Sequence, residues 1–267
     1  MKRWTINALV ALIVLIIPAF TVFPTSEFVK APRIVVKEGT STNWSGYAVP
    51  TTIQKKGTSS SVTDVKGWWI VPTAQSDGTG INTWSANWVG IDGYNSSSVE
   101  QLGTESDWYN GAPRYYAWFE MYPKPSYLVN QTINASDLMF GEVQYVNGSF
   151  ILTLKDYGSN KGKITDSSMP NWTFTLTQKS GKATLSSAEW VVEAPWSGGV
   201  LPLTNFGTTY FSGCLATIGG STKIIGGWTN YDRMDMVVSS TNLTLKDQTT
   251  ALGVDGASFS VTWHQSQ

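Results

Sequence analysis

From Asn43 to the C-terminus, short runs rich in β-branched and aromatic residues follow one another without a helical period, separated by Gly, Pro, Asn and Ser. The chain has 13 Trp, 11 Tyr and 10 Phe beside 25 Gly, a composition that suits strands joined by tight turns. In YVNGSF, Asn147 and Gly148 stand between two alternating runs, which predicts a hairpin. With no long linker and no internal repeat, the pattern predicts an all-β fold, a single antiparallel two-sheet sandwich of the concanavalin or jelly-roll kind.

The cysteine content determines how such a domain is stabilised. Cys214 is the only cysteine, so no intrachain disulfide is possible and the domain must rest on its hydrophobic core. We expect Cys214 itself to be a small buried residue rather than a reactive thiol.

The N-terminus has a basic start, Lys2-Arg3, followed by an apolar run, which is typical of a secretory signal. We predict a signal peptide or, alternatively, an uncleaved membrane anchor at 1–23, a short basic leader or pro-segment at 24–42, and one domain at 43–267, outside the cytoplasm in either case. Without residues 1–42 the chain keeps 13 basic against 17 acidic residues, so the body is acidic. An unstructured linker is the alternative for the leader. Sequons for N-glycosylation stand at Asn43, Asn95, Asn130, Asn134, Asn147, Asn171 and Asn242.

Several kinds of chemistry are excluded. The net charge is −1 and no basic cluster is present, which argues against a nucleic-acid partner. His264 is the only histidine, so a multi-histidine metal site cannot be built, and a Ser-His-Asp triad would depend on a residue we expect at a strand end. No phosphate-binding loop is found. We therefore expect no metal and no cofactor, and an enzyme would take its catalytic groups from Asp, Glu, Gln, Asn, Tyr, Lys or the backbone.

The stretch SAEWVVEAPW predicts a strand with a glutamate at each end of an apolar run. Glu189 and Glu193 share a face but lie ~13 Å apart along the strand, so they cannot act as a pair. Glycosidases need two carboxyls about 5–9.5 Å apart, which would require an acid from another strand. The simplest interpretation is that both glutamates lie on a solvated strand face.

Five motifs resemble the eqolisins, the glutamic peptidases, in content and order: NWSGYAV, ANWVGIDG, VEQLG followed by DWYNG, YYAWFEMYP, and SAEWVVEAP. The match covers about residues 43 to 196, and the C-terminal part resembles the family only loosely. The resemblance implies a β-sandwich in which the concave face of one bent sheet carries the active site, and an endopeptidase that acts in acid.

The resemblance also implies site residues. Gln101 in VEQLG and Glu193 match the catalytic glutamine and glutamate, the glutamate as base and then acid and the glutamine as oxyanion donor. An amide does not titrate, so such a pair can work at low pH. Further cleft, substrate-binding or supporting positions are Trp88, Asp92, Trp118, Glu120, Tyr122 and Glu189, the last as a same-face neighbour of Glu193.

Some features depart from the family pattern or extend it. Extra residues, TES, precede DWY, and a register slip of one would bring Glu100 to the cleft in place of Gln101. The segment 124–129 matches a flap-like loop, and APWSGGVLP after Glu193 is either a cleft wall or a plain connection. We further hypothesise that three basic leader residues hold the leader over an acidic cleft until acid weakens the attraction: Lys30, Arg33 and Lys37.

The function predicted is that of a secreted, monomeric, acid-acting endopeptidase of polypeptides, in contact with a membrane only if the N-terminal segment is uncleaved. A secreted carbohydrate-binding or glycoside-hydrolysing sandwich is the alternative, since exposed aromatics also stack on sugars. A third interpretation is an adhesion domain without activity. Gln101 opposite Glu193 separates these classes, because a glycosidase needs two carboxyls and a lectin needs neither group.

Overall fold

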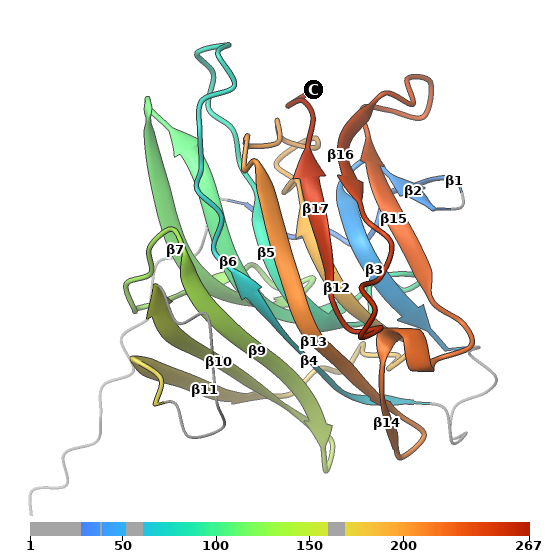
Figure 1. The fold of residues 1–267 in the computed structure, drawn as a ribbon. Coiled ribbons are helices and arrows are strands. Elements are labelled where there is room, and N and C mark those ends of the chain that lie inside the picture. The colour runs from blue at the N-terminus through green and yellow to red at the C-terminus, as the bar shows by residue number, and fades with distance from the viewer. Residues whose placement is uncertain (1–27, 38, 52–60, 160–168) are drawn as a thin grey trace, which may run out of the picture.

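The computed structural model describes residues 28–37, 39–51, 61–159 and 169–267, and these form two packed layers of antiparallel strands (Figure 1). Among these residues the only helical element is one short 3-10 turn, η1 (Ile225–Gly227). None of the helices in the described ranges is long and apolar enough to cross a membrane. The predicted signal or anchor, residues 1–23, lies outside the described residues.

Each layer is one run of hydrogen-bonded strands. The first sheet, in spatial order, consists of β8 (Tyr127–Val129), β7 (Ala112–Tyr122), β6 (Val99–Tyr109), β5 (Ala86–Ile91), β12 (Ser187–Glu193), β3 (Trp44–Pro50) and β15 (Asp232–Val237). The second sheet consists of β11 (Trp172–Gln178), β10 (Ser149–Ser159), β9 (Asp137–Val146), β4 (Val62–Ile70), β13 (Thr208–Ile218), β17 (Phe259–Trp263) and β16 (Leu245–Thr249), with β14 (Ser221–Ile224) paired to the end of β13.

Strand β15 joins the two sheets. It pairs with β3 of the first sheet and with β16 of the second. The leader is attached at the same edge, where β1 (Val35–Lys37) pairs with β2 (Thr40–Ser41), and β2 runs parallel to β15. The leader therefore enters the fold beside the first sheet.

Alternation along the strands places one set of side chains between the sheets. Leu102 and Val89 from the first sheet and Phe211 from the second are fully or almost fully buried in one core. Trp69 of β4 reaches across this core and donates its indole N–H to Thr104 Oγ1 of β6 at 2.8 Å. Because even-numbered residues of β6 face the core, its odd-numbered residues face the outer side of the first sheet.

This alternation places Gln101, and not Glu100, on the outer face of the first sheet. The Glu100 side chain accepts a hydrogen bond from Ser180 Oγ at 2.7 Å, and it points to the opposite face from Gln101. The strand runs without a bulge from Val99 to Tyr109, so the residues TES lie inside it rather than in an inserted loop.

Other sequence predictions are confirmed. The all-β sandwich is observed, and Asn147-Gly148 forms the β9–β10 hairpin turn with φ values of 50° and 81°, as a tight turn of this kind requires. Cys214 is completely buried, and His264 directly follows the last strand.

Candidate active site

The outer face of the first sheet carries three rows of side chains that cross the strands; we call it the cleft face. Registers place the members of each row side by side: Glu120, Gln101, Gly90 and Glu189 in the first, Trp118, Gly103, Trp88 and Val191 in the second, and Tyr116, Glu105, Ala86 and Glu193 in the third. Neighbours within a row are about 4.8 Å apart at their backbones. Strand pairing therefore collects an amide and four carboxyls on one face.

The middle row shows why glycine is needed between the polar rows. A Cβ at Gly103 would lie 2.3 Å from the Asn87 carbonyl oxygen and 2.6 Å from Trp88 Cβ. Without that atom, Trp88 and Trp118 both fit on the face, and both are completely buried. Trp44 packs edge-on against Trp88, with ring centroids 4.8 Å apart. The indoles of Trp88 and Trp118 thus form the floor of the cleft face between Gln101 and Glu193.

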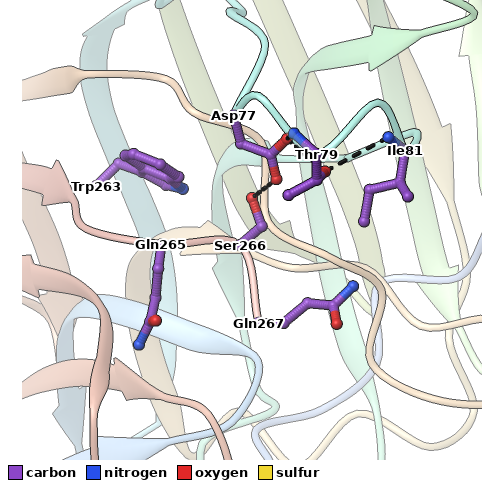
Figure 2. A pocket seen from close by; sticks show the side chains of 7 residues that line it. All are labelled: Asp77, Thr79, Ile81, Trp263, Gln265, Ser266 and Gln267. Carbon is purple, nitrogen blue, oxygen red and sulfur yellow. Dashed lines mark hydrogen bonds between the residues drawn. The ribbon is translucent and has the colours of Figure 1, made fainter.

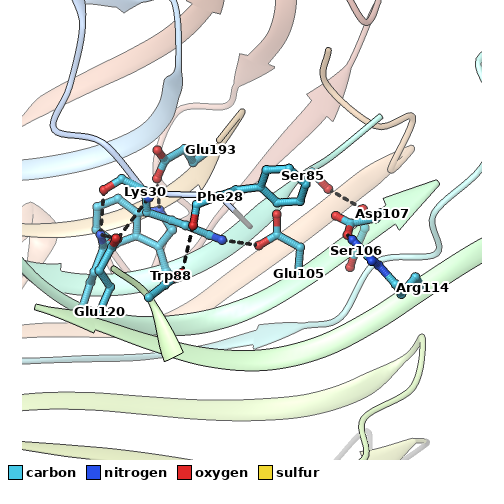
Figure 3. Close-up of polar contacts among 12 residues, drawn as sticks. Phe28, Lys30, Ser85, Trp88, Glu105, Ser106, Asp107, Arg114, Glu120 and Glu193 are labelled. Atoms are coloured by element: carbon cyan, nitrogen blue, oxygen red, sulfur yellow. Dashed lines mark hydrogen bonds and ion pairs between the residues drawn. The ribbon is translucent and has the colours of Figure 1, made fainter. Parts of the chain in front are cut away.

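Glu193 is held by this floor. Its Oε2 accepts the indole N–H of Trp88 at 2.8 Å (Figure 3). Its Oε1 has no hydrogen-bond partner within the described part of the chain. Burial raises the pKa of Glu193 well above its ordinary value; Lys30 opposes this shift and Glu120 adds to it. One oxygen is therefore fixed and the other is free to exchange a proton.

Gln101 presents a donor on the same face. Its Nε2 donates to Glu120 Oε2 at 2.9 Å and to the backbone carbonyl oxygen of Lys30 at 3.1 Å. Both partners are acceptors, which fixes the amide so that N–H groups and not Oε1 face the cleft. Burial raises the pKa of Glu120 to about 8, although Lys30 and Gln101 lower it.

The leader lies across this site, with Lys30 at its centre (Figure 3). The Lys30 N–H donates to Glu120 Oε2 at 3.1 Å, and its carbonyl oxygen accepts from Gln101. Its ammonium forms an ion pair with Glu105 Oε2 at 3.1 Å and stands 4.7 Å from the centre of the Trp118 ring. The Lys30 side chain is 0% exposed, although a lysine is rarely buried unless it is paired.

The loop after Glu193 and the predicted flap-like segment hold the residues before Lys30. Val29 and Trp196 exchange two backbone hydrogen bonds, at 3.2 and 3.0 Å, so the loop after Glu193 is a wall and not a plain connection. Ser126, in the predicted flap-like segment, donates its hydroxyl to the Phe28 carbonyl at 2.9 Å.

The residues after Lys30 are held from the other side. Asn43 Nδ2 donates to the carbonyls of Ala31 and Pro32 at 3.4 and 3.2 Å, and the Trp44 indole donates to Ala31 O at 3.0 Å. Asn43 is completely buried in this role, which conflicts with its prediction as a glycosylation sequon.

Arg33, the second basic leader residue of the hypothesis, also lies against the domain. Its guanidinium stacks 3.7 Å from the centre of the Tyr94 ring and is 3.7 Å from Asp232. The side chain of the third, Lys37, lies outside the described residues.

The interpretation of Glu189 and Glu193 as a solvated strand face is wrong. Both are completely buried. Each lies on the cleft face, but in different rows. Burial raises the pKa of Glu189 well above its ordinary value, and Asp92 and Glu100 add to the shift. The pKa of Glu193 is instead influenced by Lys30 and Glu120, so the two glutamates have different electrostatic neighbours.

Two other predicted positions lie around the rows. Tyr122, half buried, packs against the cluster of Trp88 and Trp118. The Asp92 carboxylate accepts hydrogen bonds from three successive backbone N–H groups and two hydroxyls in residues 184–186. Asp92 thus fixes the entry into β12 and supports the position of Glu193 through that strand.

Glu105 is the site residue that the sequence analysis missed. It lies four residues after Gln101 on an uninterrupted strand, so strict alternation from Gln101 identifies it as a cleft residue. It is completely buried, and burial raises its pKa, while Lys30 lowers it. Next along the face, Asp107 is paired with Arg114 at 2.8 Å.

A separate hollow of about 430 Å³ lies at the C-terminus (Figure 2). Its one acidic side chain, Asp77, is engaged with the hydroxyls of Ser266 and Thr79 at 2.5 and 2.6 Å. In the described ranges, no group of three or more His, Cys, Asp or Glu could hold a metal ion.

Comparisons with known proteins identify a family and a fold. The model described as the peptidase A4 family matches residues 42–263. Among solved structures, a scytalido-glutamic peptidase with a transition state analog inhibitor is 20% identical, with 84% of this chain and 98% of that chain covered and a TM-score of 0.64. The aspergilloglutamic peptidase from Aspergillus niger is 26% identical, with 68% and 99% covered and a TM-score of 0.55.

A third structure, SCP-B of the eqolisin family in complex with the tripeptide Ala-Ile-His, is 18% identical, with coverages of 84% and 98% and a TM-score of 0.59. No curated protein sequence matches the chain. The two structures under 25% identity support the β-sandwich fold, and the family match covers most of the chain.

Proposed function

Because this chain belongs to the peptidase A4 family, the glutamic endopeptidases, we propose that it hydrolyses peptide bonds with Glu193 as the proton-transfer group and Gln101 as the oxyanion donor. The observation that carries this assignment is the bond from Gln101 Nε2 to a peptide carbonyl oxygen, that of Lys30, at 3.1 Å. Glu193 lies beside the same residue (Figure 3). A peptide substrate in this position would have its carbonyl on the donor and its bond near the base.

The steps follow from the groups present. The ionised Glu193 takes a proton from water through Oε1 while Trp88 holds Oε2. The hydroxide adds to the substrate carbonyl carbon, and the oxygen that becomes negative is stabilised by Gln101 Nε2. Protonated Glu193 then gives its proton to the leaving amine, the C–N bond breaks, and Glu193 is ionised again. Glu120 keeps the Gln101 amide oriented by accepting its N–H.

Latency is a second part of the proposal. The leader fills the position that a substrate would need, and residues from both sides of the cleft bind its backbone. It also buries Glu193, and burial is the largest cause of the raised pKa of that carboxyl. The base is therefore covered, and its raised pKa favours the protonated form. We assign residues 24–42 as a pro-segment that must leave before the enzyme acts.

Acid is the expected trigger for release. The attraction of Lys30 for the cleft depends on an ionised Glu105, and burial raises the pKa of Glu105 against the opposing effect of Lys30. Protonation of Glu105 as the pH falls removes this attraction. Asp107 is nearby, but its charge is balanced by Arg114. The predicted signal at 1–23 is consistent with action outside the cytoplasm.

The carbohydrate-binding alternative and the inactive adhesion domain have less support. The segment bound on the cleft face is a peptide, and its carbonyl oxygen accepts the Gln101 amide N–H, which supports a polypeptide substrate rather than a sugar.

The test is digestion of denatured protein between about pH 2 and 7 by the wild type and by Gln101→Ala, with a pepsin-type inhibitor present. We expect digestion in acid that resists the inhibitor and a loss of about 10²–10³-fold in kcat for the variant. Digestion abolished by the inhibitor, or a fully active variant that folds normally, would refute the assignment.

A further inference from the structure

The leader lies on the site as a bound peptide, and its chain direction shows on which side of a scissile bond each residue would lie. Under the proposed function, Gln101 binds the carbonyl oxygen of the bond that is cleaved, and the carbonyl on Gln101 belongs to Lys30. The Lys30 side chain therefore lies where a substrate presents the side chain on the acyl side of its scissile bond. The surroundings of that side chain report what the enzyme accepts there.

These surroundings form a closed pocket that matches a long cationic side chain. The stem of Lys30 carries the ammonium over Trp118, 4.7 Å from the ring centre, to Glu105 Oε2 at 3.1 Å. Both charged side chains are 0% exposed. An aromatic face and a carboxylate around a fully buried side chain are complementary to lysine and to arginine.

Among the described residues, Glu105 is the carboxyl that forms an ion pair with the ammonium, while Glu120 and Glu193 lie near enough to interact with it electrostatically. Asp107 follows Glu105 on the same face, and its carboxylate receives two N–H groups of Arg114, at 3.2 and 2.8 Å. Arg114 therefore neutralises Asp107, and Glu105 remains as the carboxyl that faces the lysine. A buried carboxylate that is left unpaired is costly, which makes the occupant's charge matter.

We propose that Glu105, with Trp118, is the specificity-determining residue of a pocket that selects lysine or arginine on the acyl side of the scissile bond. The inference rests on the proposed function, because the polarity is taken from Gln101. A neutral side chain of similar length fills the pocket without pairing with Glu105. A glutamate at this substrate position is repelled by it.

The experiment uses the full chain after incubation in acid and a set of quenched fluorescent peptides that differ at one position: Lys, Arg, Met and Glu. The assay is run in weak acid, above the pH at which Glu105 takes up a proton, and there we expect kcat/KM for the Lys and Arg peptides of the wild type to exceed that for Met about tenfold or more, with Glu the poorest. At lower pH the same ratio should fall toward one, because protonated Glu105 no longer attracts a cation. Met is the matched neutral probe, because it has a similar length and no charge.

Glu105→Gln then tests the residue. It should reduce the Lys-to-Met ratio to near one, whereas Glu142→Gln, the same change on the other sheet, should leave the ratio as in the wild type. A wild-type enzyme that cleaves Lys and Met peptides equally, or a Glu105→Gln variant that keeps the full ratio, overturns the pocket. The wild-type series alone can refute the proposal, so the test remains decisive even if Glu105→Gln folds poorly.

The experiment distinguishes failure of the pocket from failure of the proposed function. Cleavage of all the peptides without preference overturns only the pocket. Absence of cleavage of every peptide, at any pH at which the chain is folded, overturns the proposed function and this inference with it.

Discussion

Replacement of Lys30 by methionine should release the leader from the cleft. Methionine keeps most of the stem that packs on Trp118 and removes the ammonium that pairs with Glu105 at 3.1 Å. The backbone bonds of residue 30 to Gln101 and Glu120 are retained. The substitution therefore isolates the contribution of the charge.

The magnitude follows from the burial of the pair. A hydrogen-bonded contact to a charged group contributes about 1.5–3 kcal/mol. The larger cost of an unpaired buried charge, about 3–5 kcal/mol, is avoided because Glu105, whose pKa burial already raises, takes up a proton. We therefore expect the leader to be held about 2–3 kcal/mol less tightly, which shifts the ratio of covered to open cleft by about 30–150-fold.

The assay follows hydrolysis of a fluorogenic polypeptide by freshly purified full-length chain in weak acid, without prior incubation. The wild type should show a lag, and Lys30→Met should start without one and with an initial rate tens of times higher. Lys30→Arg keeps the charge and should keep the lag, as should Lys179→Met, which alters an exposed lysine. An unchanged lag and initial rate in Lys30→Met would refute the reasoning that Lys30 retains the leader.

Two other variants test the floor of the site. Trp88→Phe removes the N–H that lowers the pKa of Glu193, so the pKa of Glu193 rises. Since the base must be ionised, the acid limb of the profile of kcat/KM against pH should move to higher pH by about 1–2 units. A limb that stays in place or moves down would contradict this. Gly103→Ala places a Cβ 2.3 Å from the Asn87 carbonyl and should lower the free energy of unfolding by about 3 kcal/mol or more in a urea titration, whereas Gly199→Ala, with open space around it, should change it little. Equal stability of these two alanine variants would show that the close packing of the strands is not as described.

Much of the fold was predictable because strand alternation is a local property. The Asn147-Gly148 turn and the opposite orientation of Glu100 and Gln101 follow from a period of two residues and from turn chemistry. The proposed catalytic pair, Gln101 and Glu193, could not be chosen in this way. Alternation places Glu189 and Glu193 on one face without distinguishing them, and only the family resemblance did so.

Burial of the site could not be inferred from strand pattern either. Carboxyls on a strand of an antiparallel sheet are normally solvated, whereas Glu193 is completely buried in a site across which the leader lies. The pair of Lys30 and Glu105 joins positions 75 residues apart in the sequence, and no local pattern encodes such a contact. A basic leader ahead of an acidic body predicted that attraction in general terms, but not the residues.

The most direct test of the central claim is kcat for Glu193→Gln in acid, after the leader has been released. Glutamine keeps an oxygen to accept the Trp88 N–H, so the shape of the floor is retained, but it cannot take a proton from water. The account predicts that kcat falls by about 10³-fold or more, with the melting temperature close to that of the wild type. A folded Glu193→Gln enzyme with kcat within tenfold of the wild type would contradict it.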